Sequence, residues 1–288
     1  MKFALVGGDE RSAMLAQLLC ADGHKLRCFA LEKAEHLPAE LKVGCLQSCV
    51  YGADCVLLPV PAERGGLLHA PLSAEKPSMV EVMAALWPGQ LVCGGKLGEE
   101  FCLQAVRGGL LVADLMTRPA FLVGNAVLTA EGALQRLMEN SPRSLWQSTV
   151  LLTGWGRIGS ILAQRLLGLG ARVTVAARKG AQRAMAEAMG CRAVSFEELE
   201  SRLGGFDFVV NTVPAPVLTD AMLCCLRPDC LLLELASLPG GFDRQLAENI
   251  GLTVLMAPGL PGSCCPYTAA QLMQRAVYEI IRELEESM

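Results

Sequence analysis

The stretch TVLLTGWGRIGSILAQRLLGLG (149–170) decides the fold. Its apolar run, TVLLT, leads directly into Gly154-Trp155-Gly156-Arg157-Ile158-Gly159, after which apolar residues recur at helical spacing. In such a strand–turn–helix unit the first glycine permits a tight turn, the second lets the backbone approach a pyrophosphate, and the third lets helix and strand pack closely. The N–H groups that open the helix favour phosphate. We therefore predict a dinucleotide site formed by Gly154, Gly156, Arg157, Ile158 and Gly159.

Short apolar runs continue on both sides of this unit. The runs that follow it are RVTVAAR (172–178), CRAVSF (191–196), DFVVNTV (207–213), CLLLELA (230–236) and LTVLMA (252–257). The runs that precede it are KFALVG (2–7), KLRCFAL (25–31), CVLLPV (55–60), LVCGG (91–95) and GLLVAD (109–114). Strands separated by helix-length segments indicate βαβ units and parallel sheets. We expect an α/β fold of two doubly wound parallel-sheet domains, of which the C-terminal one is a Rossmann dinucleotide-binding domain.

Domain boundaries follow from these patterns. We expect residues 1–118 to form a flavodoxin-like N-terminal domain that holds the substrate, and residues 149–266 to form the Rossmann domain. Residues 119–148 would connect the two domains as a linker helix. The segment 267–288 is amphipathic, so we expect it to form a helix that packs back across the domain junction onto the N-terminal domain.

Two details concern these helices. Thr129 has the side chain of an N-cap residue, so the linker helix is expected to run from Ala130 to about Glu139. The C-terminal helix has an apolar face, which suggests a homodimer.

The composition narrows the class of protein. Hydrophobic residues make up 52% of the 288 residues, charged residues make up 19%, and the formal net charge is −4. A nucleic-acid binder needs a basic face for phosphates, and no apolar run reaches the ~18–20 residues of a spanning helix, so we expect neither nucleic acid nor membrane as a partner. The 13 cysteines form no CxxC pair and the three histidines follow no ligand spacing, so we expect no metal site. These features predict a cytoplasmic protein.

The choice of cofactor depends on the end of the strand that follows the glycine-rich turn. NAD-binding domains carry an acidic residue there, which accepts hydrogen bonds from the ribose 2′-hydroxyl. This chain has Arg178 and Lys179 instead, and a guanidinium suits a 2′-phosphate, so NADP is favoured over NAD. Loops after two later strands should line the nicotinamide side, because ligands bind outside the carboxyl ends of such strands. The residues expected there are Thr212, Val213, Pro214, Ala236 and Ser237.

Several segments together carry a family resemblance. They are GGDER (7–11), NAVLTAEGAL (125–134), GWGRIG (154–159), NTVPAPVL (211–218), LASLPGGFD (235–243) and APGLPG (257–262). In this order and at this spacing they resemble the dipicolinate synthase A-subunit family of spore-forming bacteria. The resemblance implies oxidation of dihydrodipicolinate, a small dicarboxylate, to dipicolinate with NADP. It also implies a flavoprotein-like partner, the dipicolinate synthase B-subunit, and a place in the mother cell of a sporulating bacterium.

Candidate substrate and catalytic residues follow from position once the resemblance is stated. Asp9 and Arg11 lie just after the first strand, where Arg11 is placed to bind a substrate carboxylate or to lie in a surface helix that Asp9 caps. Asn125 and Glu131 flank the linker helix and are candidate catalytic residues, although Glu131 also suits a first helical turn. The family pattern implies a small-apolar, Pro, Lys, Thr run after APGLPG. This chain departs from it with Ser263-Cys264-Cys265-Pro266-Tyr267-Thr268, so Tyr267 takes the lysine's place as a candidate substrate contact.

Two other functions compete with this one. A D-2-hydroxyacid dehydrogenase shares the two-domain plan but needs a histidine late in the cofactor domain, and all three histidines lie at or before His69. A module that senses NADP and regulates a partner is the second alternative. The identity of the catalytic base and the division of chemistry between the two subunits stay open at this point.

Overall fold

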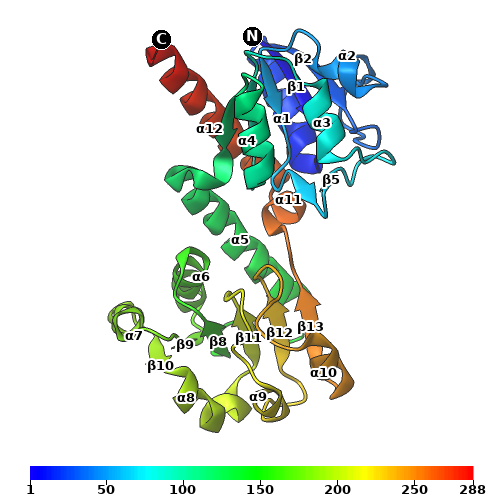
Figure 1. The fold of residues 1–288 in the computed structure, drawn as a ribbon. Helices are drawn as coiled ribbons and strands as arrows, with labels where there is room; N and C mark the ends of the chain where they lie inside the picture. Colours follow the sequence, from blue (N-terminus) through cyan, green and yellow to red (C-terminus); the bar gives the residue numbers. More distant parts are fainter. Residues whose placement is uncertain (288) are drawn as a thin grey trace. The chain divides into compact units, whose positions relative to one another are not determined.

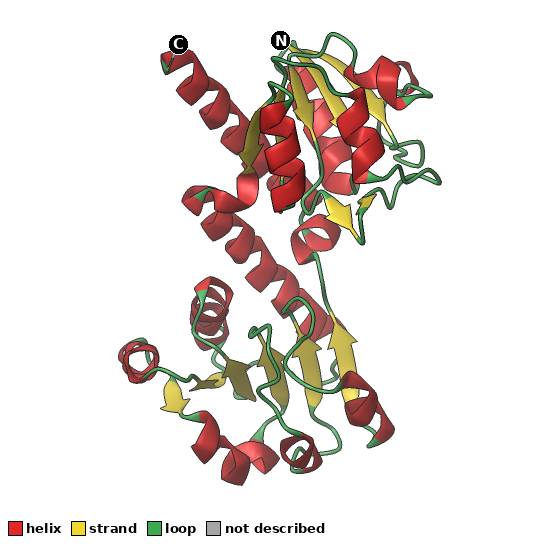
Figure 2. Cartoon of the chain, in the orientation of Figure 1, coloured by secondary structure: helices red, strands yellow, loops and turns green. Residues whose placement is uncertain are grey.

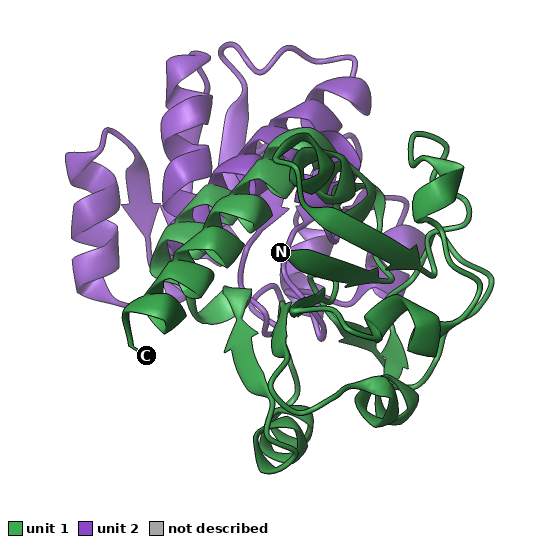
Figure 3. Ribbon diagram, turned by 90° about the horizontal axis from the view of Figure 1, so that it is seen from above, with its two compact units in different colours: residues 1–125, 265–288 green, residues 126–264 purple. Residues whose placement is uncertain are grey.

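The structure is a computed structural model that describes residues 1–287. The chain divides into two compact units, which Figure 3 colours separately. Unit 1 consists of residues 1–125 together with the segment that begins at Cys265, and unit 2 consists of residues 126–264. Each unit contains one parallel sheet with helices on its faces, so the expected α/β fold with two parallel-sheet domains is confirmed.

Unit 1 contains a five-stranded sheet in the order β2-β1-β3-β6-β7, with every neighbouring pair parallel. Figure 1 labels its strands β1 and β2. Its strands are β1 (Lys2–Val6), β2 (Lys25–Phe29), β3 (Cys55–Leu57), β6 (Leu91–Gly94) and β7 (Leu111–Asp114). A separate antiparallel pair is formed by β4 (Glu63–Arg64) and β5 (Leu67–Leu68). The chain adds β2 on one side of β1 and then adds β3 on the other side. The strand order therefore reverses between β1 and β3, and we call this place the reversal point of the sheet.

Both faces of this sheet are covered, which explains its apolar strands. Phe3 and Leu5 pack into the cluster on one face, while Ala4 and Val6 pack into the cluster on the other, as alternation along a strand requires. The helices of unit 1 are α1 (Glu10–Ala21), α2 (Leu46–Val50), α3 (Met79–Ala85), α4 (Glu99–Arg107) and α12 (Pro266–Glu286), with short 3-10 turns at Ala39–Leu41 and Leu115–Thr117.

The C-terminal helix α12 packs on α1 in unit 1. Its apolar residues Met273, Val277 and Ile280 are buried in the same cluster as Phe3 and Leu5. The apolar face that suggested a homodimer is therefore buried within the chain itself. It no longer supports the expectation of a homodimer.

Unit 2 contains a six-stranded parallel sheet in the order β10-β9-β8-β11-β12-β13. Its strands are β8 (Thr149–Thr153), β9 (Arg172–Ala176), β10 (Arg192–Val194), β11 (Phe208–Asn211), β12 (Leu231–Glu234) and β13 (Thr253–Met256). Its helices are α6 (Arg157–Gly168), α7 (Gly180–Ala188), α8 (Phe196–Leu199), α9 (Asp220–Cys224), α10 (Arg244–Asn249) and α11 (Leu260–Cys264), with a 3-10 segment at Glu200–Gly205. These helices alternate with the strands along the chain, and Figure 2 colours the helices red and the strands yellow. This is the strand order of a doubly wound dinucleotide-binding domain.

The long helix α5 (Pro119–Glu139) corrects one expectation. Thr129 does not cap it, because the helix begins ten residues earlier at Pro119 and Thr129 lies buried in its interior. A proline suits a first helical position, since its missing N–H is not needed there. Gly124, which weakens the helical pattern of the sequence, is required by packing: a Cβ at this position would lie 2.8 Å from the Leu272 side chain of α12.

Among residues 1–287, no helix is both long and apolar enough to cross a membrane.

Candidate functional site

The glycine-rich turn lies where the chain of unit 2 reverses its direction across the sheet. It follows β8, whose neighbours are β9 and β11, and ligands of doubly wound sheets bind outside the carboxyl ends of strands at this point. Gly154 has a φ of +91°, which favours glycine, and its N–H donates to the carbonyl of Ala176 at 2.8 Å. A Cβ on Gly159 would lie 2.5 Å from the carbonyl oxygen of Gly154, so only glycine lets α6 start this close to β8.

Gly156 has a different role from these two glycines. It is the N-cap residue of α6, no side chain caps the helix, and a Cβ at this position would meet no atom within 4 Å. The fold itself therefore does not need a glycine here, whereas a phosphate held by the helix N-terminus does. Arg157 is exposed at the start of α6, and Ile158 packs against the apolar cluster beneath. The turn thus fits the pyrophosphate of a dinucleotide.

The loop after β11 packs directly on this turn. A Cβ on Gly154 would lie 2.8 Å from both Thr212 Oγ1 and Val213 Cγ2. The Thr212 hydroxyl donates to the carbonyl of Thr153 at 2.7 Å, which ties the loop to β8. Pro214 is exposed beyond them.

The loop after β12 contains Ala236, which is partly exposed, and Ser237, which is exposed. It is held by Glu234, the last residue of β12, whose carboxylate accepts hydrogen bonds from Ala236 N and Gly241 N at 2.8 Å each. Asn211, the last residue of β11, donates to the same carboxylate at 2.6 Å. Sequence reasoning missed Glu234, and it included Asn211 in the segment NTVPAPVL without a role of its own. The available signal was a single polar residue closing each of two otherwise apolar strands, FVVN and LLLE.

The end of β9 carries three cations. Arg178 and Lys179 are exposed directly after the strand, as expected, and Lys179 is the N-cap of α7. Arg183, which sequence reasoning missed, lies in the first turn of α7, and its Nη1 donates to the carbonyls of Ala177 and Arg178 at 2.8 and 2.9 Å. Glu197 is close enough for the charge of Arg183 to contribute to lowering its pKa, after its hydrogen bonds with Ser195 and with its own backbone.

Unit 1 has a comparable turn at its own reversal point, between β1 and β3. Asp9 caps α1, and its carboxylate accepts hydrogen bonds from Arg11 Nε at 2.9 Å and from Arg11 Nη2 at 2.7 Å. Arg11 is only 5% exposed and also donates to the carbonyl of Val60, which follows β3. The structure thus brings together Asp9 and Arg11, two of the three substrate candidates, and joins the ends of β1 and β3 through them.

The electrostatics of this turn are set by the ion pair. Burial acts to raise the pKa of Asp9, but the hydrogen bonds and charge of Arg11 outweigh it and hold the pKa below its ordinary value. Half-buried His69 belongs to the same environment. Burial lowers its pKa, the positive charge of Arg64 lowers it further, and Asp9 acts in the opposite direction. The imidazole is therefore biased toward its neutral form.

The remaining candidates lie on helices. Glu131 is exposed on α5 and forms an ion pair with Arg165 of α6, with 3.0 Å between Oε1 and Nη2. Asn125, also on α5, is partly exposed. Tyr267 is 53% exposed in the first turn of α12. Within residues 1–287, no group of three or more His, Cys, Asp and Glu residues is arranged to hold a metal ion.

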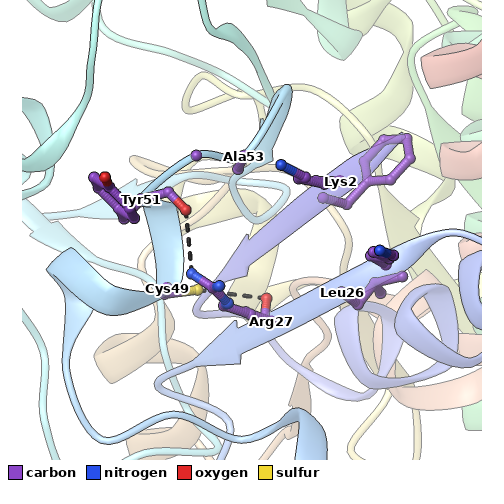
Figure 4. A pocket seen from close by; sticks show the side chains of 9 residues that line it. Lys2, Leu26, Arg27, Cys49, Tyr51 and Ala53 are labelled. Carbon is purple, nitrogen blue, oxygen red and sulfur yellow. Dashed lines mark hydrogen bonds between the residues drawn. The ribbon is translucent and has the colours of Figure 1, made fainter.

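A cavity of about 350 Å³ opens elsewhere in unit 1 (Figure 4). It lies beside Lys2 and Lys25, the first residues of β1 and β2, and therefore at the edge of the sheet opposite the Asp9–Arg11 turn. Arg27 lines it, with its Nη1 donating to the carbonyl of Tyr51 at 3.1 Å. Because parallel sheets bind ligands at the carboxyl ends of their strands, this cavity is separate from the reversal-point site.

Two family models match the chain. Residues 2–116 match the N-terminal domain of the dipicolinate synthase A-subunit. Residues 123–225 match the NAD-binding domain of the D-isomer specific 2-hydroxyacid dehydrogenases. The second range contains the glycine-rich turn, so unit 2 has the fold of a nicotinamide dinucleotide-binding domain of the dehydrogenase type.

Similar proteins match over nearly the whole length. The dipicolinate synthase A-subunit of Bacillus subtilis (strain 168) is 28% identical over 291 residues, which cover 99% of this chain and 97% of that protein. The crystal structure of the same synthase component from Bacillus subtilis has a TM-score of 0.83 at 27% identity, covering 100% of this chain and 98% of that chain. A transhydrogenase from Sinorhizobium meliloti shares the fold, with a TM-score of 0.72 at 16% identity over 98% of this chain and 93% of that chain. The resemblance that the motifs indicated is thereby confirmed: this chain is similar to the dipicolinate synthase A-subunit over nearly its full length, and its residues 2–116 match the model of that family's N-terminal domain.

Proposed function

We propose that this chain is the A-subunit of a dipicolinate synthase, an NADP-dependent oxidoreductase that converts dihydrodipicolinate to dipicolinate. The observation that carries the proposal is similarity to the Bacillus subtilis protein over 99% of this chain, combined with a dinucleotide fingerprint at the reversal point of unit 2. That protein is named as one of several subunits, which supports a partner; we propose a flavoprotein-like B-subunit. The proposed location is the mother cell of a sporulating bacterium.

The reaction sets four tasks for the protein. One C–H bond of the dihydropyridine ring breaks with its electron pair leaving as hydride, a second hydrogen leaves as a proton, and the ring becomes aromatic. Dihydrodipicolinate and NADP⁺ thus give dipicolinate, NADPH and H⁺. The nicotinamide, when bound, supplies the hydride acceptor. The chain must hold the dinucleotide, orient the ring, balance two carboxylates and accept the proton.

The residues of unit 2 suit the dinucleotide. The open position at Gly156 and the uncapped start of α6 fit a pyrophosphate. The cations Arg178, Lys179 and Arg183 fit a 2′-phosphate, which carries negative charge that a ribose hydroxyl lacks, and this supports NADP over NAD. The nicotinamide would lie beside the loops that follow β11 and β12, where Thr212, Val213, Pro214, Ala236 and Ser237 are candidate contacts.

The residues of unit 1 suit the substrate. Arg11 is oriented by Asp9, and the charges of Arg64 and Lys76 reach His69, so this edge of the sheet has cations for a dicarboxylate. Asn125 and Tyr267, also of unit 1, are candidate polar contacts to the substrate. The candidate proton acceptor, Glu131, belongs to unit 2 and is oriented by its ion pair with Arg165.

The first test is the absorbance of NADPH at 340 nm. Freshly prepared dihydrodipicolinate and NADP are mixed with this chain, with and without the B-subunit. Reduction of NADP establishes the dehydrogenase and shows whether this chain suffices alone. Calorimetric binding of NADP without any reduction, even with the B-subunit present, would instead make the chain a sensing or scaffold protein.

A 2-hydroxyacid dehydrogenase is the enzyme alternative, because the family model for residues 123–225 carries that name. The chain has histidine only at His24, His36 and His69, all before the glycine-rich turn, so unit 2 has no histidine to act as acid and base. The same spectrophotometric assay with 2-hydroxy acids in place of dihydrodipicolinate should give no reduction of NADP or NAD.

A further inference from the structure

Three loops of unit 2 meet outside the carboxyl ends of neighbouring strands β8, β11 and β12. They are the glycine-rich turn, the loop that begins at Thr212, and the loop from Leu235 to Gly241. Loops of this kind are usually the mobile parts of a domain. Here a small group of buried polar side chains, which we call the carboxylate clasp, connects all three: Thr153, Asn211 and Glu234.

Glu234 is the anchor of the clasp. It is 2% exposed, and its carboxylate accepts three hydrogen bonds: from Asn211 Nδ2 at 2.6 Å, and from Ala236 N and Gly241 N at 2.8 Å each. Two of the donors are backbone groups at opposite ends of the loop after β12. One side chain thus fixes both ends of that loop.

Asn211 connects the clasp to the other two loops. Its Oδ1 accepts from Val213 N at 3.1 Å and from the Thr153 hydroxyl, while its Nδ2 donates to the carbonyl of Val213 at 2.9 Å as well as to Glu234. A Cβ on Gly241 would lie 2.3 Å from Asn211 Cγ, so the loop after β12 lies directly against the amide. The Asn211 side chain therefore uses both polar atoms to hold these loops in one arrangement.

Packing alone does not explain why polar side chains are buried in the clasp. Burying a carboxylate is unfavourable unless it is well hydrogen-bonded, and within residues 1–287 no cation forms an ion pair with Glu234. Apolar residues would close two central strands at less cost. What the carboxylate and the amide provide is a fixed set of directions for the backbone of two loops.

We infer that Glu234 and Asn211 are positioning residues for the nicotinamide half of the dinucleotide, because they preorganise the loops that flank it. The inference rests on the proposed dinucleotide-binding function. It assigns the adenine half to a different part of the site, the cations after β9, whereas the hydrogen bonds of the Asn211 and Glu234 side chains go to Thr153, Val213, Ala236, Gly241 and each other. Loss of the clasp should therefore weaken one half of the cofactor's binding and leave the other.

The experiment compares Glu234→Gln with a matched control, Asp207→Asn. Asp207 lies just before β11, at the opposite end of the sheet, and its carboxylate accepts from both the N–H and the hydroxyl of Thr149 at 2.8 Å. Calorimetry with NADP and with 2′,5′-ADP, which lacks the nicotinamide half, separates the two halves. Glu234→Gln should raise the dissociation constant of NADP about tenfold or more and change that of 2′,5′-ADP less than about twofold. Asp207→Asn should change neither.

The pH dependence of NADP affinity in a second variant, Asn211→Asp, distinguishes loss of the clasp from loss of folding. Asn211→Asp places a second carboxyl against Glu234, so the pair must share one proton. The other groups in contact with these two side chains, from Thr153, Val213, Ala236 and Gly241, do not titrate. The shared proton bridges the pair at low pH and is lost at high pH. The NADP affinity of this variant relative to the natural chain should therefore fall as the pH rises from about 5 to about 9.

Hydrogen exchange tests the clasp without any cofactor. The amides of Ala236 and Gly241 should exchange faster in Glu234→Gln and in Asn211→Asp, and at the natural rate in Asp207→Asn. If the natural chain binds neither NADP nor NAD, the proposed function is wrong. The exchange rates still test whether Glu234 and Asn211 hold the loop after β12 in place. The positioning inference is overturned if Glu234→Gln binds NADP normally, or if it weakens 2′,5′-ADP and NADP equally.

Discussion

Replacing Gly156 with alanine separates binding from folding in a way that few positions allow. Gly156 has a φ of −94° and a ψ of −169°, which alanine adopts without strain, and the added Cβ would meet no atom within 4 Å. Alanine is a poorer N-cap than glycine but also reduces the freedom of the unfolded chain. The free energy of unfolding should therefore change by less than about 1 kcal/mol.

Binding should respond very differently. The space that the Cβ enters is where a phosphate would contact the N–H groups that open α6, and an added carbon in a filled site costs about 1–3 kcal/mol. That range corresponds to roughly a 5- to 160-fold higher dissociation constant for NADP. Isothermal titration calorimetry measures the loss of affinity, and urea denaturation measures stability.

Two other glycines in α6 serve as matched controls. Gly159→Ala places a Cβ 2.5 Å from the carbonyl oxygen of Gly154, and backbone atoms cannot easily move, so it should lose about 1–3 kcal/mol of stability as well as binding. Gly168→Ala, at the far end of the helix and with nothing within 4 Å, should be as stable as the natural chain or more stable, with normal binding. Normal NADP affinity in Gly156→Ala would refute the placement of the pyrophosphate. So would equal effects of Gly156→Ala and Gly168→Ala.

Three further outcomes follow from other contacts. Arg178→Glu should reduce the preference for NADP over NAD roughly tenfold or more, whereas Arg172→Glu at the other end of β9 should not; unchanged selectivity in a titration of both cofactors would contradict the 2′-phosphate assignment. Asp9→Asn should lower stability above about pH 5, with the deficit shrinking as the pH falls, because the depressed pKa of Asp9 gives stability that is lost on protonation. A deficit in urea unfolding that does not vary with pH would exclude that cause. Phe208→Ala should cost about 3–5 kcal/mol in the same assay, since Phe208 is fully buried.

The parts of the fold that the sequence predicted are those determined by neighbouring residues. The strand–turn–helix unit around Gly154 depends on a few consecutive residues, and the apolar strands are buried on both faces by any doubly wound arrangement. The start of α5 was predicted wrongly because Thr129 has the side chain of an N-cap residue, although it lies buried inside the helix. The helix also contains Gly124, which is unfavourable in a helix interior. Its justification is contact with Leu272, far away in the sequence.

In the candidate site, too, the residues that could be predicted are those set by neighbouring residues in the sequence. The glycines and the cations after β9 could be found from local order along the chain. The hydrogen bond between Asn211 and Glu234 could not be found in this way, because each residue looks like the polar residue that ends a strand. Only the pairing of β11 with β12 brings the amide and the carboxylate together. Arg183 was missed because its contact with the end of β9 depends on where the first turn of α7 lies.

The turns at the reversal points of the two sheets have similar backbones, but a carboxylate caps the helix in unit 1 and no side chain caps it in unit 2. Gly7 N donates to the carbonyl of Phe29 at 2.8 Å, just as Gly154 N donates to Ala176 at 2.8 Å. The helix that follows each turn begins at an extended N-cap residue: Asp9 in unit 1 and Gly156 in unit 2. The Asp9 carboxylate occupies the helix N-terminus itself, accepting from Arg11 N at 3.1 Å, and so takes the place that a phosphate would have at the start of α1. Gly156 leaves the same position open. The difference of one side chain favours the pyrophosphate at unit 2, independently of the glycine pattern that first indicated it.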